Sequence, residues 1–268
     1  MPEFFFADIF LSVIIPTYKE AGRLPRTLNE ILPYLRQNFD KFEILIVDDP
    51  ANDNTADVTE ALGISELKVI RQPFRMGKGA AVRRGLLAGQ GDFLLFMDAD
   101  HATPIEELGQ MFHLLRTGNY TWASGVRTYQ ENEDYWRRLI GISLILLAHI
   151  IVFKKAVVDS QCGFKLFSRA ACRELIPYCR VDGGMIDVEI FHLSHIRKQK
   201  CLYFPVHWEN KDNSVISVWR CMLKDPLDML KISLRSRFKI YSKPLPDIKQ
   251  PWNKIAAQIN DSSLAPGK

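Results

Sequence analysis

The stretch DFLLFMDADHATP, residues 92–104, joins an apolar run to two carboxylates. The run from Phe93 to Met97 is short and wholly apolar, which is typical of a buried central strand in a parallel sheet. Asp98 and Asp100 follow where such a strand reaches the sheet edge, and side chains two apart in extended chain point the same way. Two carboxylates this close need a counter-charge, and a divalent cation bound to a phosphate would supply it. The alternative is an exposed loop whose aspartates cap the helix predicted from TPIEEL.

Three further apolar runs end in polar residues: LSVIIP (11–16), FEILIVDD (42–49) and TWASGVR (121–127). A helical period separates the first two runs, with one apolar face formed by Leu24, Leu28, Ile31, Leu32 and Leu35. Alternating strands and helices predict an α/β fold with a mostly parallel sheet flanked by helices. Such sheets bind ligands at the carboxyl ends of their strands. The polar endings PTYKE, DD, DAD and GVR all fall there, so we expect a site at that edge.

Composition limits the class of protein. With 268 residues the chain accommodates one α/β domain and an appendage. The formal net charge of +4 is too small to indicate a nucleic-acid partner. The five cysteines form no C-x-x-C pair and are odd in number, which favours a reducing compartment over a disulfide framework.

The segment YWRRLIGISLILLAHIIVFKK (135–155) contains 15 uncharged residues between Arg137–Arg138 and Lys154–Lys155. A helix needs about 20 apolar residues to span a bilayer, so no transmembrane span is predicted here. Basic residues at both ends fit a helix, residues 137–155, that lies in the membrane interface. The alternatives are a buried core helix with snorkelling ends or a dimer contact, which would make the protein a homo-oligomer.

A second amphipathic helix is predicted in DPLDMLKISLRSRFKIYSK (225–243). Its apolar stripe comprises Leu227, Leu230, Leu234, Phe238 and Tyr241. The basic residues between them are Lys231, Arg235, Arg237 and Lys239. Such a helix after the catalytic part indicates peripheral binding to a membrane surface, on its cytoplasmic side. The predicted organisation is therefore a catalytic domain over 1–220, a basic membrane-surface helix over 221–243 and a flexible tail over 244–268.

The ordered series VIIPTYKE, VDDPANDNT, RMGKGAAVRRG, FMDADHATP, SGVR, DSQCGFKLF and MIDVEI resembles family 2 glycosyltransferases of the GT-A fold. Within that family it is most similar to the polyprenyl-phosphate sugar synthases, especially the dolichyl-phosphate glucosyltransferase group. The resemblance spans residues 11–240 and implies a Rossmann-like GT-A domain. It also implies an inverting enzyme that moves a hexose, glucose from UDP-glucose in the first instance, to a polyprenyl or dolichyl phosphate.

The resemblance implies a role for each matching residue. Asp98 and Asp100 would bind Mg²⁺ or Mn²⁺ at the donor diphosphate, and Arg127 would neutralise charge on the donor or on the lipid phosphate. Donor binding would involve Pro16, Tyr18, Glu20, Val47, Asp48, Asp49, Lys78, Asp98, Ala99, Asp100 and Arg127. Helix capping is the alternative for Asp48 and Asp49, and a solvated lysine is the alternative for Lys78.

This sequence departs from the family pattern at several positions. Pro50 and Ala51 stand in DDPA where DDGS is usual, and Arg75 stands where N-x-G-K-G has asparagine. Ala102 replaces a glutamine that is a third metal contact in some relatives, and Val215 stands where many relatives have lysine. These changes put the identity of the donor in question more than the fold.

The acceptor side depends on basic residues. A phosphate monoester has its second pKa near 6 and is already ionised at pH 7, so positioning by cations matters more than a strong base. Arg137 and Arg138 are the first candidates to bind it, with Arg127 and then Lys165. Asp159 is the candidate base, with capping or orientation of Lys165 as its alternative.

Asp187 and Glu189, in the motif MIDVEI, are expected to support the acceptor side.

The alternatives to glucose transfer are a GDP-mannose-dependent enzyme with the same lipid acceptor and a membrane-associated nucleotide-sugar-binding protein without turnover. A third is a soluble transferase acting on a saccharide hydroxyl, which would need a true base.

Overall fold

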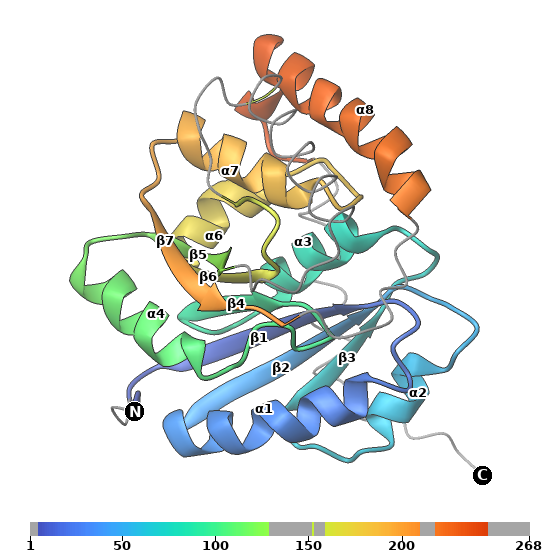
Figure 1. Ribbon diagram of the computed structural model, residues 1–268, viewed down its shortest axis with the longest axis vertical. Coiled ribbons are helices and arrows are strands. Elements are labelled where there is room, and N and C mark those ends of the chain that lie inside the picture. Colours follow the sequence, from blue (N-terminus) through green and yellow to red (C-terminus); the bar gives the residue numbers. More distant parts are fainter. Residues whose placement is uncertain (1–4, 129–151, 153–158, 210–217, 246–268) are drawn as a thin grey trace.

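The four apolar runs of the sequence become four strands of one seven-stranded sheet, whose order in the described part of the chain is β3-β2-β1-β4-β6-β5-β7 (Figure 1). The computed structural model describes residues 5–128, 152, 159–209 and 218–245. The strands are β1 Phe10–Thr17, β2 Lys41–Asp48, β3 Leu67–Arg71, β4 Phe93–Met97, β5 Trp122–Thr128, β6 Phe164–Ser168 and β7 Cys201–His207. The predicted α/β class is confirmed.

Strand directions place the site. β1 pairs in parallel with both β2 and β4, β2 with β3, and β5 with β7. β6 lies between β4 and β5 and runs antiparallel to both. The carboxyl ends of β1, β2, β4, β5 and β7 therefore share one edge, and β6 begins at that edge.

Helices cover both faces of the sheet (Figure 1). They are α1 Leu24–Asn38, α2 Thr55–Glu60, α3 Lys78–Ala88, α4 Glu107–Thr117, α6 Arg169–Leu175, α7 Ile186–Ile196 and α8 Val218–Arg237, with short 3₁₀ turns η2 Ile176–Tyr178 and η3 Ile240–Ser242. The apolar faces of α1 and α4 bury one side of the sheet, and α3, α6 and α7 bury the other. This two-faced burial explains why β1 and β4 are mostly apolar.

The outermost helix, α8, packs on the α7 side through Met229 and Ile232, which are fully buried in the same core. It spans residues 218–237, where 221–243 was predicted. It ends before Lys239, where φ is +54° and the chain leaves the helical conformation. The segment 137–155 is outside the described residues except for Val152, so its predicted interfacial position stays a prediction. Within the described part of the chain, no helix is both long enough and apolar enough to cross a bilayer.

Three strands escape the sequence pattern. β3 alternates exposed and half-buried residues at the edge of the sheet, and β7 alternates exposed and buried residues at the opposite edge. β6 has only five residues and contains a lysine, so FKLFS resembles a loop motif more than a central strand. The structure accommodates that lysine by ion-pairing it inside the fold, as described below.

Candidate active site

The donor side of the site is built on the ends of β1 and β2. The Thr17 hydroxyl donates to Asp48 Oδ1 at 2.9 Å, and burial raises the pKa of the Asp48 carboxyl. Asp49 accepts hydrogen bonds from the backbone N–H groups of Met76 (2.6 Å) and Gly77 (2.9 Å). Its carboxylate therefore holds the loop that enters α3, and it does so ahead of the first helical residue, Lys78, so it does not cap that helix as the alternative for this residue expects. Pro16 and Val47, also predicted to line the donor pocket, are buried in the sheet.

Tyr18 and Glu20 lie in the loop after β1, and each has a cationic partner. The Arg75 guanidinium carbon is 4.1 Å from the centroid of the Tyr18 ring, a cation–π contact. Arg75 is thus the residue that covers Tyr18 where family members usually have asparagine. The Glu20 carboxylate pairs with Arg23 at 2.8 Å, and burial raises its pKa despite this partner.

Asp98 and Asp100 lie directly after β4, as predicted. A Cβ atom on Gly163 would stand 1.8 Å from Asp98 Oδ2, so only glycine leaves room for the Asp98 carboxylate. The backbone N–H of Ala102 donates to Asp100 Oδ1 at 3.1 Å. Burial and the charge of Asp98 raise the pKa of Asp100. A further positive charge at this point would therefore stabilise the ionised pair, as a bound metal ion does.

Lys78 supplies part of that charge. Its Nζ lies 2.7 Å from Asp98 Oδ1, and its side chain is 30% exposed. Burial alone would lower the pKa of the Lys78 ammonium, but the carboxylates of Asp98, Asp187 and Asp100 more than offset it and raise the pKa. A solvated surface lysine, the alternative for this residue, does not describe this environment.

The turn that carries the two aspartates is held from outside. Thr27 on α1 donates its hydroxyl to the Ala99 carbonyl at 2.7 Å. His101, at φ +51°, accepts from the Ile105 N–H through Nε2 at 3.0 Å, so its Nδ1 proton faces Glu30 at 2.7 Å. The first contact fixes the backbone between the aspartates and the second fixes it directly after Asp100, so the two carboxylates are preorganised.

The carboxylates Asp98 and Asp100 fit Mg²⁺ or Mn²⁺, because these ions take carboxylate oxygens and keep positions for substrate oxygens and water. Among residues 5–128, 152, 159–209 and 218–245, no three histidine, cysteine or acidic side chains converge as a complete ligand set. A site built from the pair would therefore depend on ligands from the substrate.

A recess opens over this pair. Its lining residues are Met97, Asp98, Asp100, His101, Ala102, Thr103, Gly163, Phe164 and Trp208. Trp208 follows β7 at the carboxyl edge and was not predicted as a site residue. A prediction of strand 201–207 would have placed it there, because β7 runs parallel to β5.

Arg127, at the end of β5, is bound by Asp159. Arg127 Nε and Nη2 donate to the two carboxylate oxygens at 2.8 and 3.1 Å, and its backbone N–H donates at 3.2 Å. Burial alone would raise the pKa of Asp159, but the bonds and charge of Arg127 outweigh it and lower the pKa. Asp159 is therefore oriented toward Arg127 and is a poor proton acceptor. The Arg127 guanidinium also lies 5.4 Å from the Trp208 ring.

Lys165 and Asp187 form a buried pair at 2.6 Å, and the Lys165 side chain is 0% exposed. Lys165 thus does not face an acceptor, in contrast to the prediction, because its ammonium is needed to neutralise Asp187 inside the fold. Asp159 does not orient Lys165 either, since Arg127 occupies it. The other predicted acceptor ligands, Arg137 and Arg138, lie outside the described residues.

The sequence model of the family described as glycosyl transferase family 2 matches residues 12–176. Among curated proteins, the chain is 32% identical over 251 residues to a dolichyl-phosphate beta-glucosyltransferase of Trichomonas vaginalis, covering 88% of this chain and 76% of that protein. It is 31% identical over 257 residues to the dolichyl-phosphate beta-glucosyltransferase of Saccharomyces cerevisiae, covering 87% and 77%.

Solved structures share the fold at lower identity. Glucosyl-3-phosphoglycerate synthase from Mycobacterium tuberculosis in complex with UDP superposes with a TM-score of 0.63 at 18% identity, covering 84% of this chain and 81% of that one. The same synthase with Mn²⁺, UDP-glucose and phosphoglyceric acid gives a TM-score of 0.63 at 17% identity, covering 84% and 80%. The fold alone follows from these structures. Because the family match and the relatives above 30% identity extend along most of the sequence, this chain belongs to glycosyltransferase family 2.

Proposed function

We propose that this protein is an inverting glucosyltransferase that moves glucose from UDP-glucose to a dolichyl or other polyprenyl phosphate. The relatives at 31–32% identity are named dolichyl-phosphate beta-glucosyltransferases. The observation that carries the proposal for this chain is the state of Asp159, which is bound to Arg127 with a lowered pKa. A hydroxyl acceptor needs a base at this place, whereas an ionised phosphate does not.

Asp98 and Asp100 would hold Mg²⁺ or Mn²⁺, and a bound divalent ion would neutralise the diphosphate that leaves when the glycosidic bond breaks. The chain's own contribution is preorganisation. The Thr27 and His101 contacts fix the backbone around the two carboxylates, and Lys78 brings a permanent cation to the same point. Fixed charges aimed at the leaving group lower the barrier without reorganising during the reaction.

The acceptor phosphate would be placed by Arg127, with Arg137 and Arg138 as further proposed ligands. Asp159 holds the Arg127 guanidinium by two bonds, so the cation is directed before the acceptor arrives. The phosphate oxygen then attacks the sugar carbon on the face opposite the departing diphosphate, which inverts the configuration. The acceptor oxygen carries no proton at pH 7, so no proton has to be moved.

The outer face of α8 is proposed to contact the membrane that holds the lipid acceptor. Leu227, Leu230 and Leu234 of α8 are 58, 48 and 44% exposed, and Phe238, directly after the helix, is 70% exposed. Exposed basic residues surround them: Lys224, Lys231, Arg237 and Lys239. An apolar stripe with a basic border fits the interface of a bilayer with anionic headgroups. The cytoplasmic side is favoured by the free cysteines Cys162, Cys172, Cys179 and Cys201.

Glucose transfer is tested with the purified full chain and radiolabelled donor. Label is expected in the lipid extract with UDP-glucose and dolichyl phosphate, but not with dolichol, which differs from it only by the phosphate. Transfer to dolichol would contradict the phosphate-acceptor mechanism, and transfer from GDP-mannose alone would identify a mannosyltransferase. Tight UDP-glucose binding without any transfer would identify a binding protein.

Membrane contact is tested separately by sedimentation with vesicles. Changing Leu230 and Leu234 together to serine should release the protein from vesicles that contain phosphatidylserine. The matched control changes Leu62 and Leu114, which are similarly exposed at 39 and 37% but lie away from α8, and should leave binding unchanged. Equal binding by both double variants would show that α8 is not the contact.

A further inference from the structure

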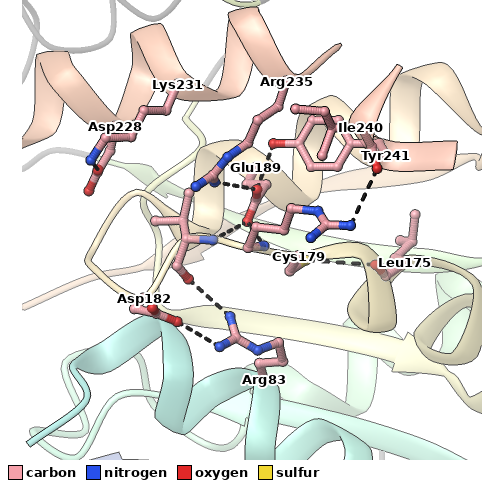
Figure 2. A network of polar contacts seen from close by, with 12 residues as sticks. Arg83, Leu175, Cys179, Asp182, Glu189, Asp228, Lys231, Arg235, Ile240 and Tyr241 are labelled. Atoms are coloured by element: carbon pink, nitrogen blue, oxygen red, sulfur yellow. Dashed lines mark hydrogen bonds and ion pairs between the residues drawn. The ribbon is translucent and has the colours of Figure 1, made fainter. Parts of the chain in front are cut away.

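Glu189, in the first turn of α7, is a buried carboxylate that the donor and acceptor contacts above do not use (Figure 2). Its side chain is 0% exposed. One oxygen, Oε2, accepts from the backbone N–H groups of Arg180 at 2.7 Å and Val181 at 2.8 Å. The other, Oε1, accepts from the Tyr241 hydroxyl at 2.6 Å and lies 3.6 Å from Arg235 Nη1. A single carboxylate thus joins α7, the loop at 180–183, α8 and η3.

The loop that Glu189 holds rests directly on the start of α3. The Gly79 N–H donates to the Asp182 carbonyl at 2.9 Å. A Cβ atom at Gly77 would stand 2.4 Å from the Asp182 carbonyl oxygen, and one at Gly79 would stand 2.4 Å from the Val181 carbonyl oxygen. The two glycines of RMGKGAA are therefore explained by the close approach of this loop.

Arg83, one turn further along α3, also binds the loop at 180–183. Its Nη1 donates to the Val181 carbonyl at 3.3 Å, and its Nη2 pairs with Asp182 Oδ1 at 2.6 Å (Figure 2). The loop thus has two attachments, Glu189 above and Arg83 below. Both attachments hold the loop against residues 77–79.

Lys78 lies between the two glycines, and its Nζ is 2.7 Å from Asp98 Oδ1. We propose that Glu189 is a positioning residue for Lys78: it fixes the loop at 180–183, and that loop sets the backbone from which Lys78 reaches Asp98. The proposal deepens the proposed function, because it concerns the charge at the donor site, and it rests on that function for the identity of the donor. It also links α8, through Arg235, and η3, through Tyr241, to the same lysine.

Glu189→Gln is the direct test, because the amide keeps the size of the side chain but turns one acceptor into a donor. It cannot accept from both backbone N–H groups and the tyrosine as the carboxylate does. Tyr241→Phe is a milder variant that removes one donor and keeps the carboxylate. Ser194→Ala is the matched control. Ser194 is buried on the same helix, and its hydroxyl accepts from Trp122 Nε1 at 2.8 Å and not from the loop at 180–183.

The first measurement is amide hydrogen exchange of residues 76–82 and 179–184 in the protein without ligand. Glu189→Gln should speed exchange in both segments, Tyr241→Phe should do so less, and Ser194→Ala should leave both unchanged. Unchanged exchange in Glu189→Gln, or equal acceleration in Ser194→Ala, would overturn the proposal. This measurement needs neither donor nor acceptor, so a wild-type protein that transfers no glucose would refute the proposed function alone.

The second measurement is calorimetric binding of UDP in the presence of Mn²⁺, arranged as a double-mutant cycle with Lys78→Met. Glu189→Gln should weaken binding about tenfold in the wild-type background, a typical size for indirect coupling. The same change should have almost no effect when Lys78 is already methionine. A tenfold loss in both backgrounds would show that Glu189 does not act through Lys78 and would reject the positioning role.

Discussion

Asp159→Asn separates an anchoring role of Asp159 from a catalytic one. The carboxylate is 3% exposed and accepts from Arg127 Nε and Nη2, from the Arg127 N–H and from the Gln161 N–H. Breaking a buried pair by removing one partner costs about 3–5 kcal/mol. The asparagine oxygen still accepts from one backbone N–H, so we expect the lower end, about 3 kcal/mol. For a chain of this size that lowers the melting temperature by about 6–12 °C.

The pH dependence of this loss follows from the lowered pKa of Asp159. A carboxyl whose pKa is lower in the folded state contributes stability that is present above its unfolded pKa, about 3.9, and is lost as pH falls through the folded pKa. The difference in melting temperature between wild type and Asp159→Asn should therefore be full at pH 7 and should shrink below about pH 4. Thermal unfolding followed by circular dichroism at several pH values measures it.

Kinetics complete the test. As an anchor, Asp159→Asn should reduce kcat less than Asp98→Asn does, and adding Arg127→Met should recover part of the lost stability by removing the uncompensated cation. An unchanged melting temperature together with a loss of kcat as large as that of Asp98→Asn would refute the reasoning. Asp159 would then be the base of a transferase that acts on a hydroxyl.

Three other outcomes are expected. Asp98→Asn and Asp100→Asn should each lower kcat/KM by at least about 100-fold with little change in melting temperature, and EDTA should abolish turnover until Mg²⁺ or Mn²⁺ is restored. Trp208→Ala should weaken UDP-glucose binding about threefold to tenfold, measured by calorimetry, and leave UDP binding unchanged, because the ring lines the recess beside the carboxylates. Burial and the charge of Asp228 raise the pKa of Asp225 to about 6, so ionisation of this carboxyl lowers the free energy of unfolding. The stability of the folded protein with neutral Asp225 is fully present below about pH 4 and is lost as pH rises through 6. Asp225→Asn should therefore raise the free energy of unfolding by about 2 kcal/mol at pH 8 and leave it unchanged at pH 4, as measured by urea titration.

Local patterns predicted the central part of the fold well. β1, β2 and β4 are buried on both faces, so they appear in the sequence as continuous apolar runs, and the face of α1 repeats with the helical period. β6 was missed because its lysine is neutralised by Asp187, a partner 22 positions away that no local window contains. The same limit applies to β3 and β7, whose half-polar patterns follow from their places at the two edges.

For the site, local patterns predict where the residues lie but not which of them form ion pairs. Asp98, Asp100 and Arg127 follow strands, so the rule that parallel sheets bind at their carboxyl edge places them from sequence alone. Which charges pair is a different matter, because Lys78 reaches Asp98 and Arg127 reaches Asp159 across 20 and 32 positions of the chain. Gly77 and Gly79 illustrate the point further: a G-x-G before a helix indicates phosphate binding, yet here it admits another backbone.

The reversed direction of β6 has a consequence for how such a chain can diversify. β5 ends and β6 begins at the same edge of the sheet, so the connection between them starts beside Arg127 and ends, at Gly163, beside Asp98. A connection whose two ends are fixed at one edge can change in length and composition without shifting the register of any strand. Gene duplication and mutation can then replace this segment while the donor side of the site, on the ends of β1 and β2, is kept. The acceptor of a descendant enzyme can diverge faster than its choice of nucleotide, and grafting the segment between homologues is a direct route to altered acceptor use.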